Sequence, residues 1–166
     1  MIIADDYWMG RQISHPADLT PAIRANAAEL IGRVNLLLSL AYGDNVRPAL
    51  DAKTGTHIAS GWRPPAVNDA TSNAAKRSKH LTGEAIDLRD SGTRDLARWC
   101  LRNLDALEEI GLWMEDPQWT PTWVHLQTVP PGSRRRVYCP SSAPPLASRL
   151  PEQIETGGGL PASGFA

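Results

Sequence analysis

The sequence has little cysteine, no long apolar run and almost no net charge. Its two cysteines, Cys100 and Cys139, stand far apart in 166 residues, which excludes a CxxC motif and a disulfide framework. No run of about 18 apolar residues occurs, so no membrane insertion is predicted. The formal net charge of −1 excludes bulk electrostatic attraction as a means of binding nucleic acid or an anionic membrane. These absences favour a globular domain stabilised by its own core.

What is present has the composition of one globular domain. Hydrophobic residues make up 42% and charged residues 21% of the chain, as in ordinary soluble domains. The first residues, MIIADDYWMGR, carry two acids where a signal peptide would be basic, so we expect synthesis in the cytoplasm without a signal peptide. After Tyr138 the composition shifts to Pro, Ser, Gly and Ala. This shift predicts a single domain over residues 1–138 and a C-terminal tail over 139–166.

Two segments have the hydrophobic period of a helix. The first follows Thr20 and Pro21, which suit a capping residue and a first helical position, and continues to Gly43. The second is expected to begin near Ser91 or Thr93 and to end before Gly111.

The rest of the domain predicts short strands and one long loop. Extended segments bounded by turn residues are expected at 56–60, 84–88, 112–115 and 123–128. A polar surface loop is expected over 68–79, because that stretch has no apolar period. The predicted fold class is α+β, with a small, largely antiparallel sheet packed with two main helices.

Three residues could form a metal site. Asp87 and His125 each lie in an alternating extended segment, AIDL and WVHLQ, and His80 stands at the end of the polar loop. Neighbouring strands would let Asp87 and His125 point at one place, within reach of His80. A catalytic zinc site needs about three such ligands and an open position for water. Each residue could also be an ordinary capping or hydrogen-bonding residue, and spacing alone leaves both readings open.

The motifs SGWRPP, SKHLTGEAIDL and TWVHLQ, in this order over roughly residues 57–127, resemble the M15 family of zinc peptidases. That family includes D-alanyl-D-alanine carboxypeptidases and phage endolysins of the L-alanyl-D-glutamate peptidase type. The resemblance implies that one zinc ion is bound by His80, Asp87 and His125. It also implies a fold shared with the hedgehog signalling domain, and hydrolysis of peptide bonds in the stem peptides of bacterial peptidoglycan.

The resemblance implies roles for four further residues. Arg63 matches the family arginine that holds a substrate carboxylate or stabilises the oxyanion, a role suited to a planar, permanently charged group. Ser78 is expected to hydrogen-bond substrate or a metal ligand, or to stabilise its turn. Trp62 and Trp123 flank the site and are expected to line a substrate groove.

The general base of the family has no counterpart at its usual positions. Thr122 stands three residues before His125, the last histidine ligand, and Trp123 stands two residues before it. Gln127 stands two residues after it. None of these side chains can take a proton from water at neutral pH. The nearest acids upstream, Glu115 and Asp116, are therefore both candidates for the base.

The leading hypothesis is a zinc metallopeptidase of the cell wall, either carboxypeptidase or endopeptidase, encoded by a phage or prophage. Such an endolysin would be made in the cytoplasm and would reach the wall through a pore or in a virion. Its partner is a peptidoglycan peptide, and the oligomeric state is left open. One alternative is a non-catalytic, zinc-containing module that binds peptidoglycan. Another is a structural component of a phage particle.

Overall fold

The structure, a computed structural model, describes residues 1–140. The predicted tail at 139–166 lies almost wholly outside the described residues. The helices are α1 (Ala4–Trp8), α2 (Arg11–Ser14), α3 (Pro21–Gly43), α4 (Pro65–Ala70), α5 (Asp95–Arg102) and α6 (Leu104–Ile110). The strands are β1 (Ile58–Ser60), β2 (Ala85–Arg89), β3 (Trp113–Glu115), β4 (Trp123–Gln127) and β5 (Val137–Tyr138).

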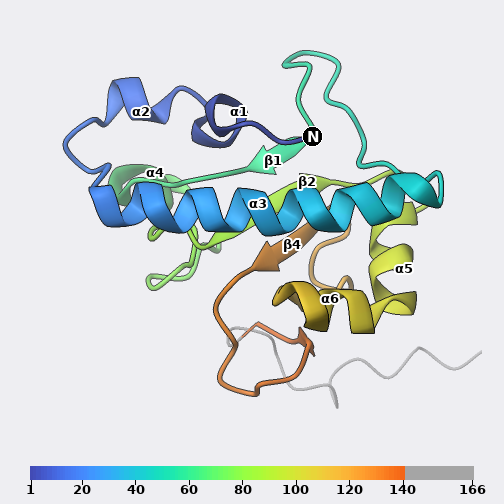
Figure 1. The fold of residues 1–166 in the computed structure, drawn as a ribbon. Helices are drawn as coiled ribbons and strands as arrows, with labels where there is room; N and C mark the ends of the chain where they lie inside the picture. Colours follow the sequence, from blue (N-terminus) through green and yellow to red (C-terminus); the bar gives the residue numbers. More distant parts are fainter. Residues whose placement is uncertain (141–166) are drawn as a thin grey trace, which may run out of the picture.

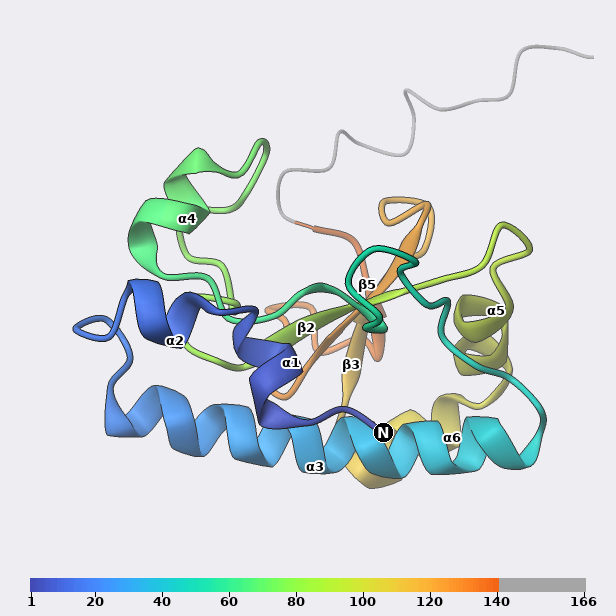
Figure 2. The same cartoon turned by 90° about the horizontal axis from the view of Figure 1, so that it is seen from above.

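The long helix α3 lies along one face of the sheet (Figures 1 and 2). Its start is fixed by the Thr20 side chain, which accepts a hydrogen bond from the Ile23 amide at 3.2 Å, with Pro21 as the first helical residue. The predicted bounds, from Pro21 to Gly43, are confirmed. One stripe of the helix is buried: Ala27, Leu30, Val34, Leu37, Leu38 and Ala41.

The second predicted helix is wrong as a single element. It is divided into α5 and α6 at Asn103, whose backbone leaves the helical region (φ −124°, ψ 49°). The Asn103 side-chain amide donates to the Trp99 carbonyl at 2.8 Å, and such local bonds compete with helix continuation. The predicted end is confirmed, because Gly111 follows α6 in the left-handed region with φ 76°.

The sheet has five strands in the order β1-β2-β4-β3-β5. All neighbouring pairs are antiparallel except β3 and β5, which are parallel. The α+β class and the four predicted extended segments are therefore confirmed, and the sheet is mixed. The sequence did not predict β5, which has only two residues and so shows no period.

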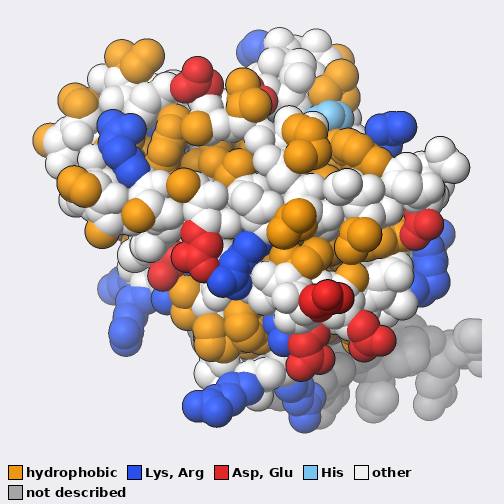
Figure 3. All heavy atoms as spheres, viewed as in Figure 1, with side chains coloured by type: hydrophobic (Ala, Val, Ile, Leu, Met, Phe, Trp, Pro, Cys, Tyr) orange, Lys and Arg blue, Asp and Glu red, His pale blue; other side chains and the backbone are white. Residues whose placement is uncertain are grey.

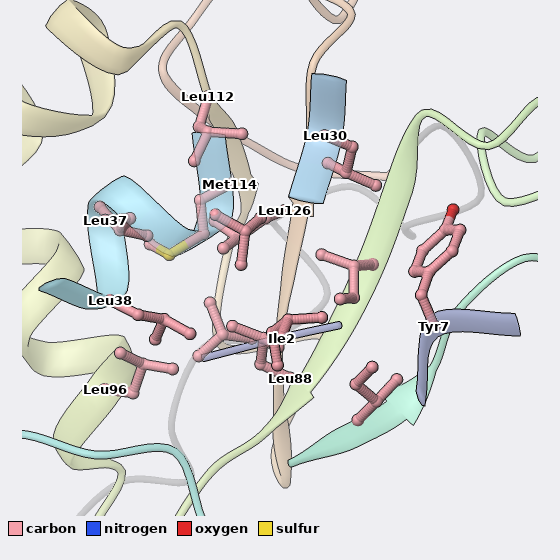
Figure 4. Packing of buried hydrophobic residues seen from close by; sticks show 14 of the residues in the cluster. Ile2, Tyr7, Leu30, Leu37, Leu38, Leu88, Leu96, Leu112, Met114 and Leu126 are labelled. Carbon is pink, nitrogen blue, oxygen red and sulfur yellow. The ribbon is translucent and has the colours of Figure 1, made fainter. Parts of the chain in front are cut away.

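One face of the sheet packs on α3 and forms the core. Figure 4 shows Leu30, Leu37 and Leu38 of the helix gathered with Leu88, Met114 and Leu126 of the strands. Each of these side chains is fully buried, and burial of one leucine contributes about 1.5–3 kcal/mol of hydrophobic stabilisation. The outer side of α3 mixes charged and apolar side chains (Figure 3).

The other face of the sheet carries a polar row, one residue from each strand. Asp87 pairs with Ser60 on one side and with His125 on the other. The β3–β4 register, continued by one residue, sets Glu115 opposite His125, and Glu115 pairs with Tyr138. Residues paired across strands lie on the same face. Ser60 joins this row through a register shift between Ile58 and Ser60, which turns its side chain from the core face.

The predicted surface loop over 68–79 is wrong at its start. Helix α4 extends to Ala70, and Asn68 within it is only 3% exposed. The Asn68 side chain donates to the Ala75 carbonyl at 3.1 Å and so holds the loop that follows. Among residues 1–140, no helix combines the length and apolar character needed to cross a membrane.

Candidate metal centre

His80, Asp87 and His125 meet at one point on the polar face of the sheet. One ligand atom from each of the three residues lies within 4.8 Å of the others. His80 Nε2 is 3.3 Å and His125 Nδ1 is 2.7 Å from the same oxygen, Asp87 Oδ1. The predicted cluster is therefore present, and these three residues could hold a metal ion.

His80 is held with one ring nitrogen ready for a ligand role. Its Nδ1 lies 2.8 Å from the Gly61 carbonyl, an acceptor, so Nδ1 carries the proton and Nε2 has the free lone pair. The ring is 2% exposed, and Nε2 has no hydrogen-bond partner among the described residues. A buried nitrogen without a partner is costly, and a metal ion would satisfy it. The ring N–H of a metal-binding histidine that faces away from the metal is typically anchored by such an acceptor.

Asp87 and His125 face each other because β2 and β4 pair at these residues. Burial raises the pKa of Asp87, but the nearby His80 and the hydrogen bond from His125 outweigh burial and hold the pKa of Asp87 well below its usual range. Burial lowers the pKa of His125, while the Asp87 contact outweighs this and raises it. Burial lowers the pKa of His80. An ionised Asp87 beside a neutral His80 is the state that binds a cation.

Arg63 lies in the site and is bound to Asp87. Its Nη2 donates to Asp87 Oδ2 at 3.0 Å and its Nε donates to Ser60 Oγ at 2.9 Å. Its backbone amide also donates to the His80 carbonyl at 3.1 Å. The guanidinium therefore fixes the orientation of Asp87, leaving Oδ1 toward the two histidines.

The two candidate bases have different surroundings. Glu115 belongs to the polar row opposite His125 and is partly buried. Burial raises the pKa of Glu115, as do the charges of Asp87 and Asp116, while His125 lowers it. Asp116 follows the end of β3, and its side chain accepts from the Gln118 amide at 2.9 Å in the next turn. Only Glu115 of the two is therefore placed beside the candidate metal ligands.

Gln127 and Tyr138 are site residues that sequence reasoning missed. The Tyr138 hydroxyl donates to Gln127 Oε1 at 2.7 Å, and the Gln127 side chain helps to raise the pKa of His125. Alternation in WVHLQ could have placed Gln127 on the His125 face. No local pattern marks Tyr138, which reaches the site only because β5 pairs with β3.

The residues predicted to contact substrate lie in different surroundings in the structure. Trp62 has no exposed surface and packs edge-on against Trp8, with ring centroids 5.9 Å apart. The prediction that its ring lines a groove is wrong, because the indole fills the core beneath α1. Trp123 is partly exposed, two residues before His125 on β4. Ser78 accepts a hydrogen bond from the His80 amide at 3.3 Å, which suits the turn-stabilising alternative.

Comparisons of this chain with protein-family models, with curated proteins and with solved structures found no match. Its function therefore has to be inferred from the residues and the geometry of this site.

Proposed function

We propose that this protein is a zinc-dependent peptidase that hydrolyses peptide bonds in the stem peptides of bacterial peptidoglycan. The observation that carries the proposal is the buried His80 Nε2, which has no hydrogen-bond partner and faces Asp87 Oδ1 with His125 on the other side. Two imidazoles and one carboxylate are a donor set that zinc favours, and a three-residue set leaves an open position.

The metal would supply the electrophile and the nucleophile. When bound by His80, Asp87 and His125, zinc polarises a carbonyl oxygen and lowers the pKa of its bound water to about 7.

The chain itself supplies the proton acceptor. We assign this role to the Glu115 carboxylate, which is the acid of the polar row nearest the ligands in strand order. Its pKa is raised by burial, and a base is most effective when its pKa approaches the working pH. Glu115 would take a proton from the attacking water and return it to the leaving amine.

Arg63 would act on the ligand Asp87. Its bond to Oδ2 holds the carboxylate in one orientation, and oriented ligands commonly determine metal affinity. Its positive charge would also stabilise a carbonyl oxygen that becomes negative beside it during hydrolysis.

The substrate class rests on the three ordered motifs, which resemble those of M15 peptidases. The motif residues that meet in the site are Arg63, His80, Asp87 and His125. The same motif residues lie together in space, although they are spread over 63 to 125 in the sequence. This agreement between motif and geometry supports a peptidase of that class.

The decisive experiment measures metal content and wall hydrolysis together. Purified wild-type protein is expected to contain about one zinc per chain and to release new amino termini from purified cell walls. Asp87→Ala should lose both, whereas Asp105→Ala, at an exposed position of α6, should keep both. A wild-type protein without metal, unchanged by added zinc, would contradict the proposal. Zinc-loaded protein that sediments with walls and leaves them uncut would indicate a binding module instead.

A further inference from the structure

The N-terminal segment lies in close contact with the segment that carries Arg63. The Trp62 amide donates to the Tyr7 carbonyl at 3.3 Å, and the Gly61 amide donates to Met9 Sδ at 3.3 Å. A Cβ atom at Gly61 would lie 1.9 Å from the Tyr7 carbonyl oxygen, so only glycine allows this approach. The N-terminal segment therefore packs directly on the backbone that precedes Arg63, although it lies far from the motifs in sequence.

Arg11, the first residue of α2, reaches the same segment. Its Nη1 donates to the Trp62 carbonyl at 2.5 Å, which belongs to the peptide group that joins Trp62 to Arg63. Figure 2 shows α1 and α2 on the side of the sheet that carries β1 and α4. The two guanidinium groups are therefore brought to neighbouring places by segments about fifty residues apart.

The two arginines differ in how their charge is balanced. Arg63 is paired with Asp87, whereas Arg11 forms no ion pair with any described residue. Partial burial lowers the pKa of Arg11, and the positive charge of Arg63 lowers it further. Asp87 thus balances the charge of Arg63 alone. A partly buried cation without a counter-ion is unfavourable, and an incoming anion would relieve this cost.

We propose that Arg11 binds a carboxylate group of the peptide substrate and so determines a preference for substrates with that group. The identity of the substrate as a stem peptide rests on the proposed function. Arg11 suits the task because a guanidinium can bind a carboxylate through two parallel N–H groups. Arg63 is less suited, since its Nε and Nη2 are already bound to Ser60 and Asp87.

The test compares two forms of one soluble peptide, the stem pentapeptide L-Ala-γ-D-Glu-L-Lys-D-Ala-D-Ala. One form has its carboxyl groups free, and the other has them amidated. Arg11→Gln should raise KM for the free form about 10-fold to 100-fold, as expected for loss of one charged hydrogen-bonded pair, with kcat little changed. It should leave the KM of the amidated form unchanged. Arg11→Lys should lie between the two.

The control is Arg24→Gln, which removes a charge from α3 beside Trp8 and should not alter either KM. Glutamine is too short to reach the Trp62 carbonyl as Arg11 Nη1 does, so melting temperature and zinc content are measured to establish that Arg11→Gln folds, and Arg11→Lys, which retains a long donor, is compared with it. Three results would each overturn the role of Arg11: an equal change in KM for both peptides, an equal change in KM in Arg11→Gln and Arg24→Gln, or no change in KM in Arg11→Gln.

Calorimetric titration of the zinc-loaded protein with the same peptides separates this inference from the peptidase proposal. Binding of the free form alone, lost in Arg11→Gln and without hydrolysis, would support Arg11 and contradict the peptidase. Hydrolysis that does not depend on the carboxylates would contradict Arg11 and support the peptidase. Neither binding nor hydrolysis would overturn both.

Discussion

At the scale of single residues, the two oxygens of Asp87 have different tasks. Oδ1 lies between His80 and His125, and Oδ2 accepts from Arg63. Removal of the carboxylate would leave the Arg63 side chain, only 12% exposed, without its partner. Breaking a buried pair from one side commonly costs 3–5 kcal/mol, roughly the scale of a small domain's whole stability. Asp87 is therefore both a candidate metal ligand and the counter-charge of Arg63.

The first prediction concerns the general base. Glu115→Gln should retain zinc and lower the rate of peptide hydrolysis about 100-fold to 10,000-fold, because it removes the proton acceptor and keeps the side-chain shape. Asp116→Asn is the matched control, since Asp116 accepts from the Gln118 amide in a turn, and it should hydrolyse at the wild-type rate. Initial rates and zinc content are measured on the same samples. If Asp116→Asn hydrolysed peptide slowly and Glu115→Gln at the wild-type rate, Asp116 and not Glu115 would be the general base.

The second prediction concerns the stability of the metal-free protein. Burial raises the pKa of Glu115 above its ordinary value of 4.5, so the unfolded chain releases this proton more readily than the folded protein. As pH rises above 4.5, ionisation of Glu115 therefore lowers the free energy of unfolding. Glu115→Gln should have a higher melting temperature than wild type at pH 7, and the difference should vanish toward pH 4.

This difference is measured by thermal unfolding in the presence of a chelator, since a bound cation would favour the ionised carboxylate. Asp87 and the two histidines titrate in both proteins, but the contribution of His125 changes with the substitution, because the charge of Glu115 raises the pKa of His125. A difference in melting temperature that stayed constant between pH 4 and pH 7 would contradict the argument from the raised pKa of Glu115.

At the scale of elements, the site depends on how α1 is packed against the Ser60–Arg63 segment. The Gly61 carbonyl accepts from His80 Nδ1, and the Tyr7 hydroxyl donates to the Ala85 carbonyl on β2 at 3.0 Å. A small N-terminal helix thus touches the backbone at two places next to the ligands. Displacement of α1 would be transmitted to His80 through Gly61.

The third prediction uses two glycines. Gly61→Ala should lower the free energy of unfolding by about 1–3 kcal/mol, because its Cβ would overlap the Tyr7 carbonyl. It should also weaken zinc binding about 10-fold or more, since the anchor of His80 shifts. Gly32→Ala, at an open position of α3, should instead stabilise the protein by about 0.5–1 kcal/mol. Denaturant unfolding and zinc titration measure both, and equal effects at the two positions would contradict the packing argument.

At the scale of the whole molecule, a metal ion would join distant parts of the chain. Its ligands come from the loop before β2, from β2 and from β4, and His125 is 38 residues from Asp87. An unfolded chain does not hold these ligands together, so binding energy adds to folding stability.

The fourth prediction follows from this linkage. Zinc at about 100 times its dissociation constant should raise the free energy of unfolding by about 2.7 kcal/mol, a rise in melting temperature of roughly 10 °C. A chelator should reverse the shift. His125→Ala should show no response to zinc, whereas replacement of the distant His15 should not change the response. A full zinc response in His125→Ala would place the metal elsewhere.

The sequence by itself determined those features that are written within a few neighbouring residues. The start of α3 follows from Thr20 and Pro21, and its end and buried stripe follow from a local period. Alternation in the segments around Asp87 and His125 predicted strands with those side chains on one face. The same alternation made Asp87 and His125 candidate ligands, because the residue type and the strand face are both local properties. The resemblance of the ordered motifs implied the set of three with His80.

Only the tertiary structure decided what depends on pairing across long stretches of chain. The choice of Glu115 over Asp116 follows from the register of β3 on β4. The burial of Trp62 follows from the position of α1, and the approach of Arg11 from a contact across 51 residues. No window of the sequence contains both partners of such a contact. The free energy of many distant contacts together fixes the register and the packing, and thereby the site.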